Sequence, residues 1–294
     1  MAEGTPVRET KIIAVGNQKG GVGKTTLTVG LARALAERGK LSLIVDLDEN
    51  HGATNHFGID PEGFYGAFEI MVGSEVPETV LLTSDVEEEI WLPENVHLII
   101  CNRKIQRIDS ALREQNKMRN PHTMLADPLN TLRGKYDYIF LDTAPNSASP
   151  TIAAYKAADF FLLAALPETF AVKGLNDALT DIDDARKNGN ANLQLLGVVL
   201  IGVDLRTNLA RELLQYVTDT FTPEHGRSRK FDTRIDRSTV IPAAQKEGKT
   251  IFETEPKHKV TEQFRELAEE FEERVRELSA PSVKATPSVG VANG

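Results

Sequence analysis

The sequence has little of what several classes of protein require. Its 294 residues include one cysteine, Cys101, which excludes a disulfide framework, a zinc site built from thiolates and any metal cluster that needs several thiolates from one chain. No apolar run reaches the roughly 18 residues that cross a bilayer. The opening residues MAEGTPVRETK lack the apolar core of a secretory signal. These absences predict a protein of the reducing cytoplasm with no membrane partner.

An excess of positive charge is also missing. The chain has 43 acidic residues against 34 lysines and arginines, a formal net charge of -9. This balance excludes a wholly basic nucleic-acid binder but leaves room for a local basic patch. Hydrophobic residues make up 40% of the chain, which is enough for a core and unlike the composition of a disordered protein. The length is compatible with one large domain.

Short apolar runs alternate with helical patterns along most of the chain. The runs are continuously apolar, which is typical of parallel strands covered on both faces, and they predict strands at 11–17, 41–48, 96–101, 136–143, 159–167 and 193–203. Helical spacing of apolar residues predicts helices at 25–39, 148–157, 169–187, 206–221 and 259–278. The alternation predicts an α/β fold with a doubly wound, mostly parallel sheet flanked by helices.

The domain boundaries follow from composition. Residues 1–10 are polar and contain glycine and proline, which predicts a flexible N-terminus, and residues 11–279 form one predicted domain. The Pro/Gly/Ser/Ala-rich residues 280–294 predict a disordered tail. Within the domain, residues 60–130 support only the strand at 96–101, and their contribution is left open.

A glycine-rich segment joins the first predicted strand to the first predicted helix. It reads GNQKGGVGKTT over residues 16–26. In such a loop, backbone N–H groups point at an anion beside the positive end of the helix dipole. Lys24 can reach the β- and γ-phosphates and the Thr25 hydroxyl can bind Mg²⁺, which predicts ATP and Mg²⁺ as ligands. The predicted nucleotide contacts are Lys19, Gly20, Gly21, Val22, Gly23, Lys24, Thr25 and Thr26.

This loop resembles the deviant P-loop of the ParA/MinD family of ATPases. Gln18 stands where the strict P-loop pattern has its first glycine, and Lys19 supplies the second lysine that marks the family. The resemblance implies a P-loop ATPase that forms a homodimer around the nucleotide, with Lys19 reaching the phosphates of the other subunit. Lys19 and Lys24 are then both catalytic, because a second cation stabilises the charge that builds on the phosphoryl oxygens.

Two further segments resemble the carboxylate motifs of that family. DLDENHGAT (46–54) is similar to switch I, which implies that Asp48 orients or activates the attacking water and that Asp46 supports the metal. Glu49 and Asn50 replace the usual Pro-Gln, so we expect a less rigid loop. YIFLDTAP (138–145) is similar to the Walker B strand, which implies that Asp142 holds Mg²⁺ through a water molecule. The alternative for either aspartate is an ordinary strand-end cap.

Within the family, the chain is most similar to ParA proteins over residues 11–279. The stretch 202–221 resembles the D-x-R-T-N-L helix start of chromosomal ParA proteins. The resemblance implies sequence-independent DNA binding in which Arg206 contacts the DNA backbone. A second family arginine aligns with Val240, so Arg234 or Arg237 is the predicted substitute. Asp204 is the predicted adenine contact.

Charge supports a DNA surface near the C-terminus. Residues 226–260 contain nine lysines and arginines against five acidic residues, a local excess of positive charge in an acidic chain. An ordinary solvated face is the alternative explanation.

The sequence therefore predicts a cytoplasmic, nucleoid-associated partition ATPase that segregates chromosome or plasmid DNA with a ParB-like activator. A ParA-like ATPase that positions a protein cargo is the alternative that the sequence does not separate, because the partner selects the cargo. A MinD-type protein is disfavoured, since the helix at 259–278 is acidic rather than basic. A non-enzymatic scaffold is disfavoured by Lys24, Thr25, Asp48 and Asp142.

Overall fold

The computed structural model describes residues 8–84, 90–114, 124–169, 171–222 and 228–280. The predicted tail at 280–294 and the first seven residues of the predicted flexible N-terminus lie outside these residues, apart from Ala280. Residues 8–10 are attached to the domain, since the Arg8 guanidinium donates to Asp137 at 3.0 Å and Thr10 donates to the Tyr136 carbonyl.

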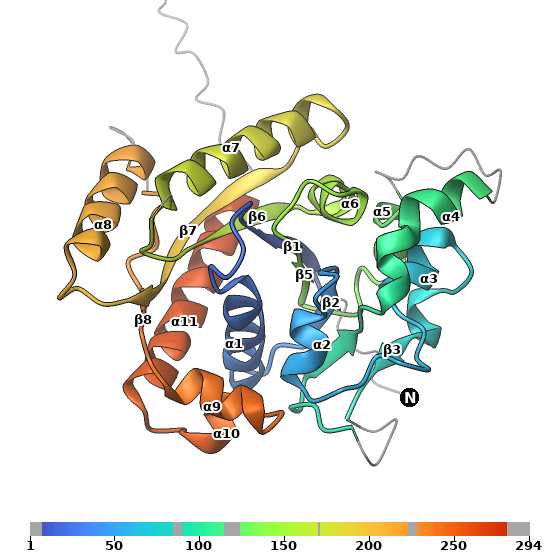
Figure 1. Cartoon of the computed structure of the whole chain (residues 1–294), viewed down its shortest axis with the longest axis horizontal. Coiled ribbons are helices and arrows are strands. Elements are labelled where there is room, and N and C mark those ends of the chain that lie inside the picture. The colour runs from blue at the N-terminus through green and yellow to red at the C-terminus, as the bar shows by residue number, and fades with distance from the viewer. Residues whose placement is uncertain (1–7, 85–89, 115–123, 170, 223–227, 281–294) are drawn as a thin grey trace, which may run out of the picture.

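The described residues form one eight-stranded sheet with the order β3-β4-β2-β5-β1-β6-β7-β8 (Figure 1). Every described pair is parallel except β3–β4, which is antiparallel. The bounds are β1 Lys11–Gly16, β2 Ser42–Asp46, β3 Leu81–Leu82, β4 Val96–Ile99, β5 Tyr138–Asp142, β6 Phe160–Ala165, β7 Gln194–Val203 and β8 Ile235–Asp236. The prediction of a doubly wound, mostly parallel sheet is confirmed, and the two strands it missed are the two-residue strands at the edges.

Helices cover both faces of this sheet. Their bounds are α1 Lys24–Glu37, α2 Gly52–His56, α3 Ala67–Val72, α4 Ile108–Glu114, α5 Ala126–Asn130, α6 Ser149–Ala157, α7 Ala171–Lys187, α8 Asn208–Phe221, α9 Val240–Lys246, α10 Ile251–Thr254 and α11 Lys259–Ser279. All five predicted helices are present, and those that were missed are seven residues or shorter. No helix of the described chain is both long enough and apolar enough to cross a membrane.

Two apolar cores lie on the two faces of the sheet, and β1 supplies both. Ile13 and Val15 join the core under α1 and α11, whereas Ile12 and Ala14 join the core under α6, α7 and α8 (Figure 1). Successive side chains of a strand point to opposite faces, so a strand covered on both sides must be apolar throughout. Part of the region from 60 to 130 forms α3, α4 and α5, which extend the second core around the β4 edge.

Helix α11 fixes the position of two neighbouring segments. A Cβ atom on Gly30 of α1 would lie 2.3 Å from the Phe264 ring, so α1 and α11 approach closely at this point. Further along α11, buried Glu270 and Arg274 form an ion pair at 2.7 Å. Glu270 also accepts from the Asp232 and Thr233 N–H groups at 2.9 Å. The chain leading into β8 is therefore held against the helix.

The contact between α1 and α11 predicts an unusual response to a glycine substitution. Replacement of an exposed glycine within a helix by alanine usually stabilises the protein, by roughly 0.5–1 kcal/mol. We expect Gly30→Ala instead to lower the free energy of unfolding by about 1–3 kcal/mol, because the methyl group overlaps the Phe264 ring. Urea unfolding measures the change, and the double variant Gly30→Ala/Phe264→Leu should recover part of it. A single variant as stable as the parent would contradict the close packing.

Candidate active site

The carboxyl ends of three central strands bring the predicted catalytic residues together. The glycine-rich loop follows β1, and Asp46 and Asp142 are the last residues of β2 and β5. The pairing of β2 with β5 places these two aspartates opposite each other in register, and Val15 of β1 also pairs with Asp142. Residues more than a hundred positions apart in the sequence therefore meet at one edge of the sheet.

The backbone of the loop requires glycine at two positions. Gly21 and Gly23 have φ angles of 74° and 84°, in the left-handed region that side chains rarely adopt. Gly23 is also the N-cap of α1, and a Cβ atom there would lie 3.1 Å from Ile201 of β7. The loop thus leads directly into the positive end of a helix of 14 residues, which is the arrangement that binds phosphate groups.

Lys24 is a buried cation at this helix start. Its Nζ atom lies 3.5 Å from the Lys19 carbonyl oxygen, so the loop curls around the ammonium group. Burial lowers the pKa of Lys24, while the charges of Asp142 and Asp48 oppose that shift. A lysine beside the loop backbone and within the field of two carboxylates is positioned to meet the anionic end of a nucleotide.

Thr25 and Asp142 form the candidate metal site. Thr25 Oγ1 donates to Asp142 Oδ2 at 2.7 Å, and Asp142 is fully buried. Burial first, and then the charge of Asp46, raises the pKa of Asp142 well above its ordinary range. No cluster of three or more His, Cys, Asp or Glu suitable for a metal occurs among the described residues. One hydroxyl and one carboxylate fit Mg²⁺, which keeps several waters and takes other ligands from phosphates.

Asp46 is engaged in holding the switch I segment. Its carboxylate accepts from the Thr54 N–H at 2.9 Å, from the Thr54 hydroxyl at 2.7 Å and from the Asp48 N–H at 3.1 Å. Burial raises the pKa of Asp46, and these hydrogen bonds oppose the shift. The structure therefore shows Asp46 positioning Asp48 and α2, and its support of a metal stays a prediction.

Asp48 lies in a tight turn that the sequence did not predict. Its Oδ1 atom accepts from both the backbone and the side-chain nitrogen of Asn50 at 2.9 Å. His51 follows with a φ angle of 56°, and Gly52 approaches so closely that a Cβ atom there would lie 2.5 Å from Thr25 Oγ1. The substitution of Asn50 for the usual glutamine thus provides a direct partner for Asp48, and Gly52 is required for the loop to reach the metal site.

Lys19 lies in an ion pair within its own chain. Its Nζ atom donates to Glu168 Oε2 at 2.9 Å and to the Thr169 carbonyl at 2.8 Å. Its backbone N–H donates to Asn17 Oδ1 at 2.9 Å. Sequence reasoning gave no role to either partner: Asn17 lies within the glycine-rich segment but is not one of its predicted phosphate contacts, and Glu168 lies 149 positions from Lys19 in the sequence.

The four residues predicted to contact DNA or adenine all line one cavity, which lies at the ends of β7 and β8. We call this space of about 630 Å³ the basic cleft. Its charged lining consists of Asp204, Arg206, Arg234, Asp236, Arg237 and Lys259. Both carboxylate oxygens of Asp204 accept from the Arg206 guanidinium, at 2.8 and 2.7 Å. The candidate adenine contact is therefore paired with the candidate DNA contact. Val240 packs against the apolar core instead of facing the cleft.

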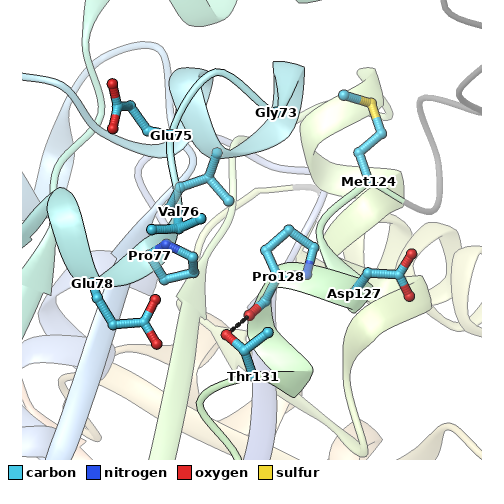
Figure 2. Close-up of a pocket in the computed structure, with 10 residues that line it drawn as sticks. Gly73, Glu75, Val76, Pro77, Glu78, Met124, Asp127, Pro128 and Thr131 are labelled. Carbon is cyan, nitrogen blue, oxygen red and sulfur yellow. Dashed lines mark hydrogen bonds between the residues drawn. The ribbon is translucent and has the colours of Figure 1, made fainter.

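A further cavity lies away from both the candidate catalytic residues and the basic cleft. Figure 2 shows this space of about 520 Å³, which is lined by residues of α3, α5 and the short 3₁₀ helix at Pro77–Thr79. Glu75, Glu78 and Asp127 are its charged residues, and none of the predicted site residues lines it. A phosphate-binding role is unsuited to a space whose charged groups are carboxylates.

Comparison with known proteins agrees with this geometry. A family described as an AAA domain matches residues 10–195, which include the loop, Asp48 and Asp142. The sporulation initiation inhibitor protein Soj of Bacillus subtilis is 31% identical, over 88% of this chain and 97% of that protein. The chromosome-partitioning ATPase Soj of Thermus thermophilus is also 31% identical, over 90% of this chain and 96% of that protein.

Solved structures with the same fold include nucleotide complexes. Cobyrinic acid a,c-diamide synthase of Mycobacterium smegmatis with ADP and magnesium aligns with a TM-score of 0.70 at 28% identity, covering 88% of this chain and 93% of that one. The septum site-determining protein MinD of Pyrococcus horikoshii with Mg-ADP has a TM-score of 0.70 at 24% identity, over 92% of this chain and 100% of that one. Given the match over more than half of its length and its likeness to whole Soj proteins, the chain belongs to the ParA/Soj family of P-loop ATPases.

Proposed function

We propose that this ATPase is a partition protein that dimerises around ATP and Mg²⁺, binds DNA without sequence preference on the nucleoid, and segregates chromosome or plasmid DNA with a ParB-like partner. The observation that carries the nucleotide part is the meeting of Lys24, Thr25, Asp48 and Asp142 at one sheet edge. The name of the Thermus thermophilus relative, a chromosome-partitioning ATPase, supports the cellular role. Positioning of a protein cargo would use the same ATP-dependent binding to DNA.

The chain's own groups account for each step of hydrolysis. The loop N–H groups and Lys24 bind the phosphates, and Thr25 and Asp142 hold Mg²⁺, which would neutralise charge on the β- and γ-phosphoryl oxygens. Asp48 accepts a hydrogen bond from water and orients it for in-line attack. Asp46 keeps Asp48 in place through its N–H group.

Lys19 is the residue that would link two subunits through the nucleotide. It is bound to Glu168 in the single chain, with side chains 27% and 54% exposed. An ion pair at the surface stabilises a protein by at most about 1 kcal/mol. Release of Lys19 from Glu168 therefore costs little, and the triphosphate of a second subunit is the acceptor that the family resemblance implies.

The basic cleft supports the DNA-binding part of the proposal. Arg206, Arg234 and Arg237 were predicted separately from the sequence, and all three line one cavity. Lys259 also lines it and was missed, because it begins the acidic helix α11. Clustered cations that contact phosphates bind DNA independently of its sequence.

Lys24→Ala tests the phosphate contact. Removing the buried ammonium deletes a charge-assisted interaction, and we expect the affinity for ATP to fall at least about 10-fold. Binding of a fluorescent ATP analogue measures the change. Lys40→Ala is the matched control, because Lys40 pairs with Glu272 on α11 and lies outside the loop. Equal affinity of the Lys24 variant and the parent would contradict the assignment of the loop.

Asp48→Ala tests the hydrolytic carboxylate and the dimer together. Without the group that orients water, we expect phosphate release to fall by roughly 100-fold or more, and the protein to accumulate as a dimer with ATP and Mg²⁺. Phosphate release and light scattering measure the two effects. Asp60→Ala provides the control, since Asp60 is an exposed carboxylate after α2. A variant that stays monomeric with ATP and Mg²⁺ would overturn the sandwich dimer.

Arg206→Ala and Arg237→Ala test the basic cleft. Each should weaken binding to a random-sequence duplex and reduce the slope of log K against log salt concentration by up to about one unit, because a phosphate contact is lost. Fluorescence anisotropy with ATP and Mg²⁺ measures both quantities. Arg186→Ala, on α7, removes a cation that is outside the cleft and pairs with Asp183. If neither cleft variant differs from that control, DNA binds elsewhere.

A further inference from the structure

The basic cleft contains two carboxylates as well as its cations. Asp204 follows β7, and Asp236 is the last residue of β8, so they enter the cleft from neighbouring strands. Asp236 accepts from Lys259 Nζ at 2.6 Å and from Arg234 Nε at 3.3 Å. Among the residues that the structure describes, the Arg237 side chain forms no hydrogen bond or ion pair like these, although its charge helps to lower the pKa of Asp204. The cations of the cleft therefore differ in how freely they can meet an incoming phosphate.

Asp204 occupies one bidentate edge of the Arg206 guanidinium. The Arg206 Nε donates to Oδ1 at 2.8 Å and its terminal nitrogen donates to Oδ2 at 2.7 Å, a parallel pair of hydrogen bonds. The Arg206 backbone N–H also donates to Oδ1 at 3.1 Å. Hydrogen bonds from Arg206, the largest influence, lower the pKa of Asp204 to about 2, so the carboxylate is charged at any physiological pH.

A carboxylate and a phosphate use the same side of a guanidinium group. Both accept two parallel N–H bonds from its planar fork, so the edge of Arg206 that faces Asp204 cannot bind a DNA phosphate at the same time, and a phosphate at the terminal edge meets the negative charge of Asp204 nearby. The Arg206 side chain is 91% exposed, so no packing prevents it from leaving Asp204. Asp204 is only two residues away and stays close to any phosphate that Arg206 contacts.

We propose that Asp204 is an internal competitor for DNA, which holds Arg206 in the bidentate geometry that a DNA phosphate would otherwise take and so weakens and tunes DNA binding. The inference rests on the DNA binding proposed above and concerns its regulation. Weak binding suits a protein that must bind and leave DNA repeatedly, since the rate of release rises as affinity falls. Asp204 is a positioning residue in this account, because it acts on DNA through Arg206.

Asp204→Asn is the decisive variant. The amide keeps an oxygen that can accept from the Arg206 N–H, so the turn before α8 is preserved, but the charge that retains the guanidinium is lost. We expect DNA affinity to rise by about 3- to 10-fold at low salt and the slope of log K against log salt to steepen by a fraction of a unit, because Arg206 then contacts a phosphate in a larger share of the complexes. In the Arg206→Ala background, Asp204→Asn should leave that slope unchanged.

The measurement uses the full chain, a short random-sequence duplex, and ATP with Mg²⁺. Asp183→Asn is the matched control, because it removes the same charge from an Asp–Arg pair on α7, 3.2 Å apart and outside the cleft. Thermal melting and light scattering establish that each variant is folded and has the parent's oligomeric state. Titration with a fluorescent ATP analogue shows that any gain in DNA affinity does not come from tighter nucleotide binding.

Three results would overturn the inference. One is a gain in DNA affinity no larger than that of Asp183→Asn, which would mean that Asp204 acts only through the net charge of the protein. Another is the same change in slope with and without Arg206, and the third is weaker DNA binding by Asp204→Asn, which would mean that Asp204 holds Arg206 in its productive position. If the parent protein itself binds no duplex with ATP and Mg²⁺, the DNA-binding function fails as well, and the two failures are thereby distinguished.

Discussion

The candidate active site depends on how the negative charge of its buried carboxylates is neutralised. Asp46 and Asp142 end adjacent strands in register and are fully buried, and Asp48 lies two residues beyond Asp46. Lys24 is the cation whose charge lowers the pKa of Asp142, against the effect of burial. With one ammonium group among three carboxylates, burial favours the protonated forms of Asp46 and Asp142, and a bare triphosphate would add further negative charge. The geometry therefore favours a nucleotide that arrives with a divalent cation over a nucleotide alone.

The fold was largely predictable, because its central elements carry strong local patterns. The six predicted strands are continuously apolar, as strands covered by helices on both faces must be. The two-residue strands β3 and β8 are too short to show a period, and their pairing is decided by distant segments. The same holds for α4 and α5, which are seven and five residues long and are held by packing at the sheet edge.

The candidate site was predictable as a set of residues, but its connections were not. The glycine loop, Asp48 and Asp142 belong to motifs with fixed local spacing, so the sequence names them directly. Glu168, which holds Lys19, and Lys259, which lines the basic cleft, were given no role of their own from the sequence, because they reach their partners only through the tertiary fold. Composition does not show which oppositely charged side chains pair with each other. The net excess of basic residues at 226–260 therefore did not reveal that most cations of the basic cleft already have acidic partners.

Beyond Lys259 at its first position, helix α11 contributes no charged group to either functional region, yet it packs against both of them. Phe264 sets the approach of α1, whose first turn carries the phosphate-binding lysine, and Glu270 and Arg274 fasten the strand that brings cations to the cleft. Gln263 adds a hydrogen bond to the Asp236 N–H at 3.0 Å. Substitutions on the side of α11 that faces the sheet are consequently expected to affect nucleotide binding and DNA binding together. This makes α11 one of the least replaceable parts of the enzyme.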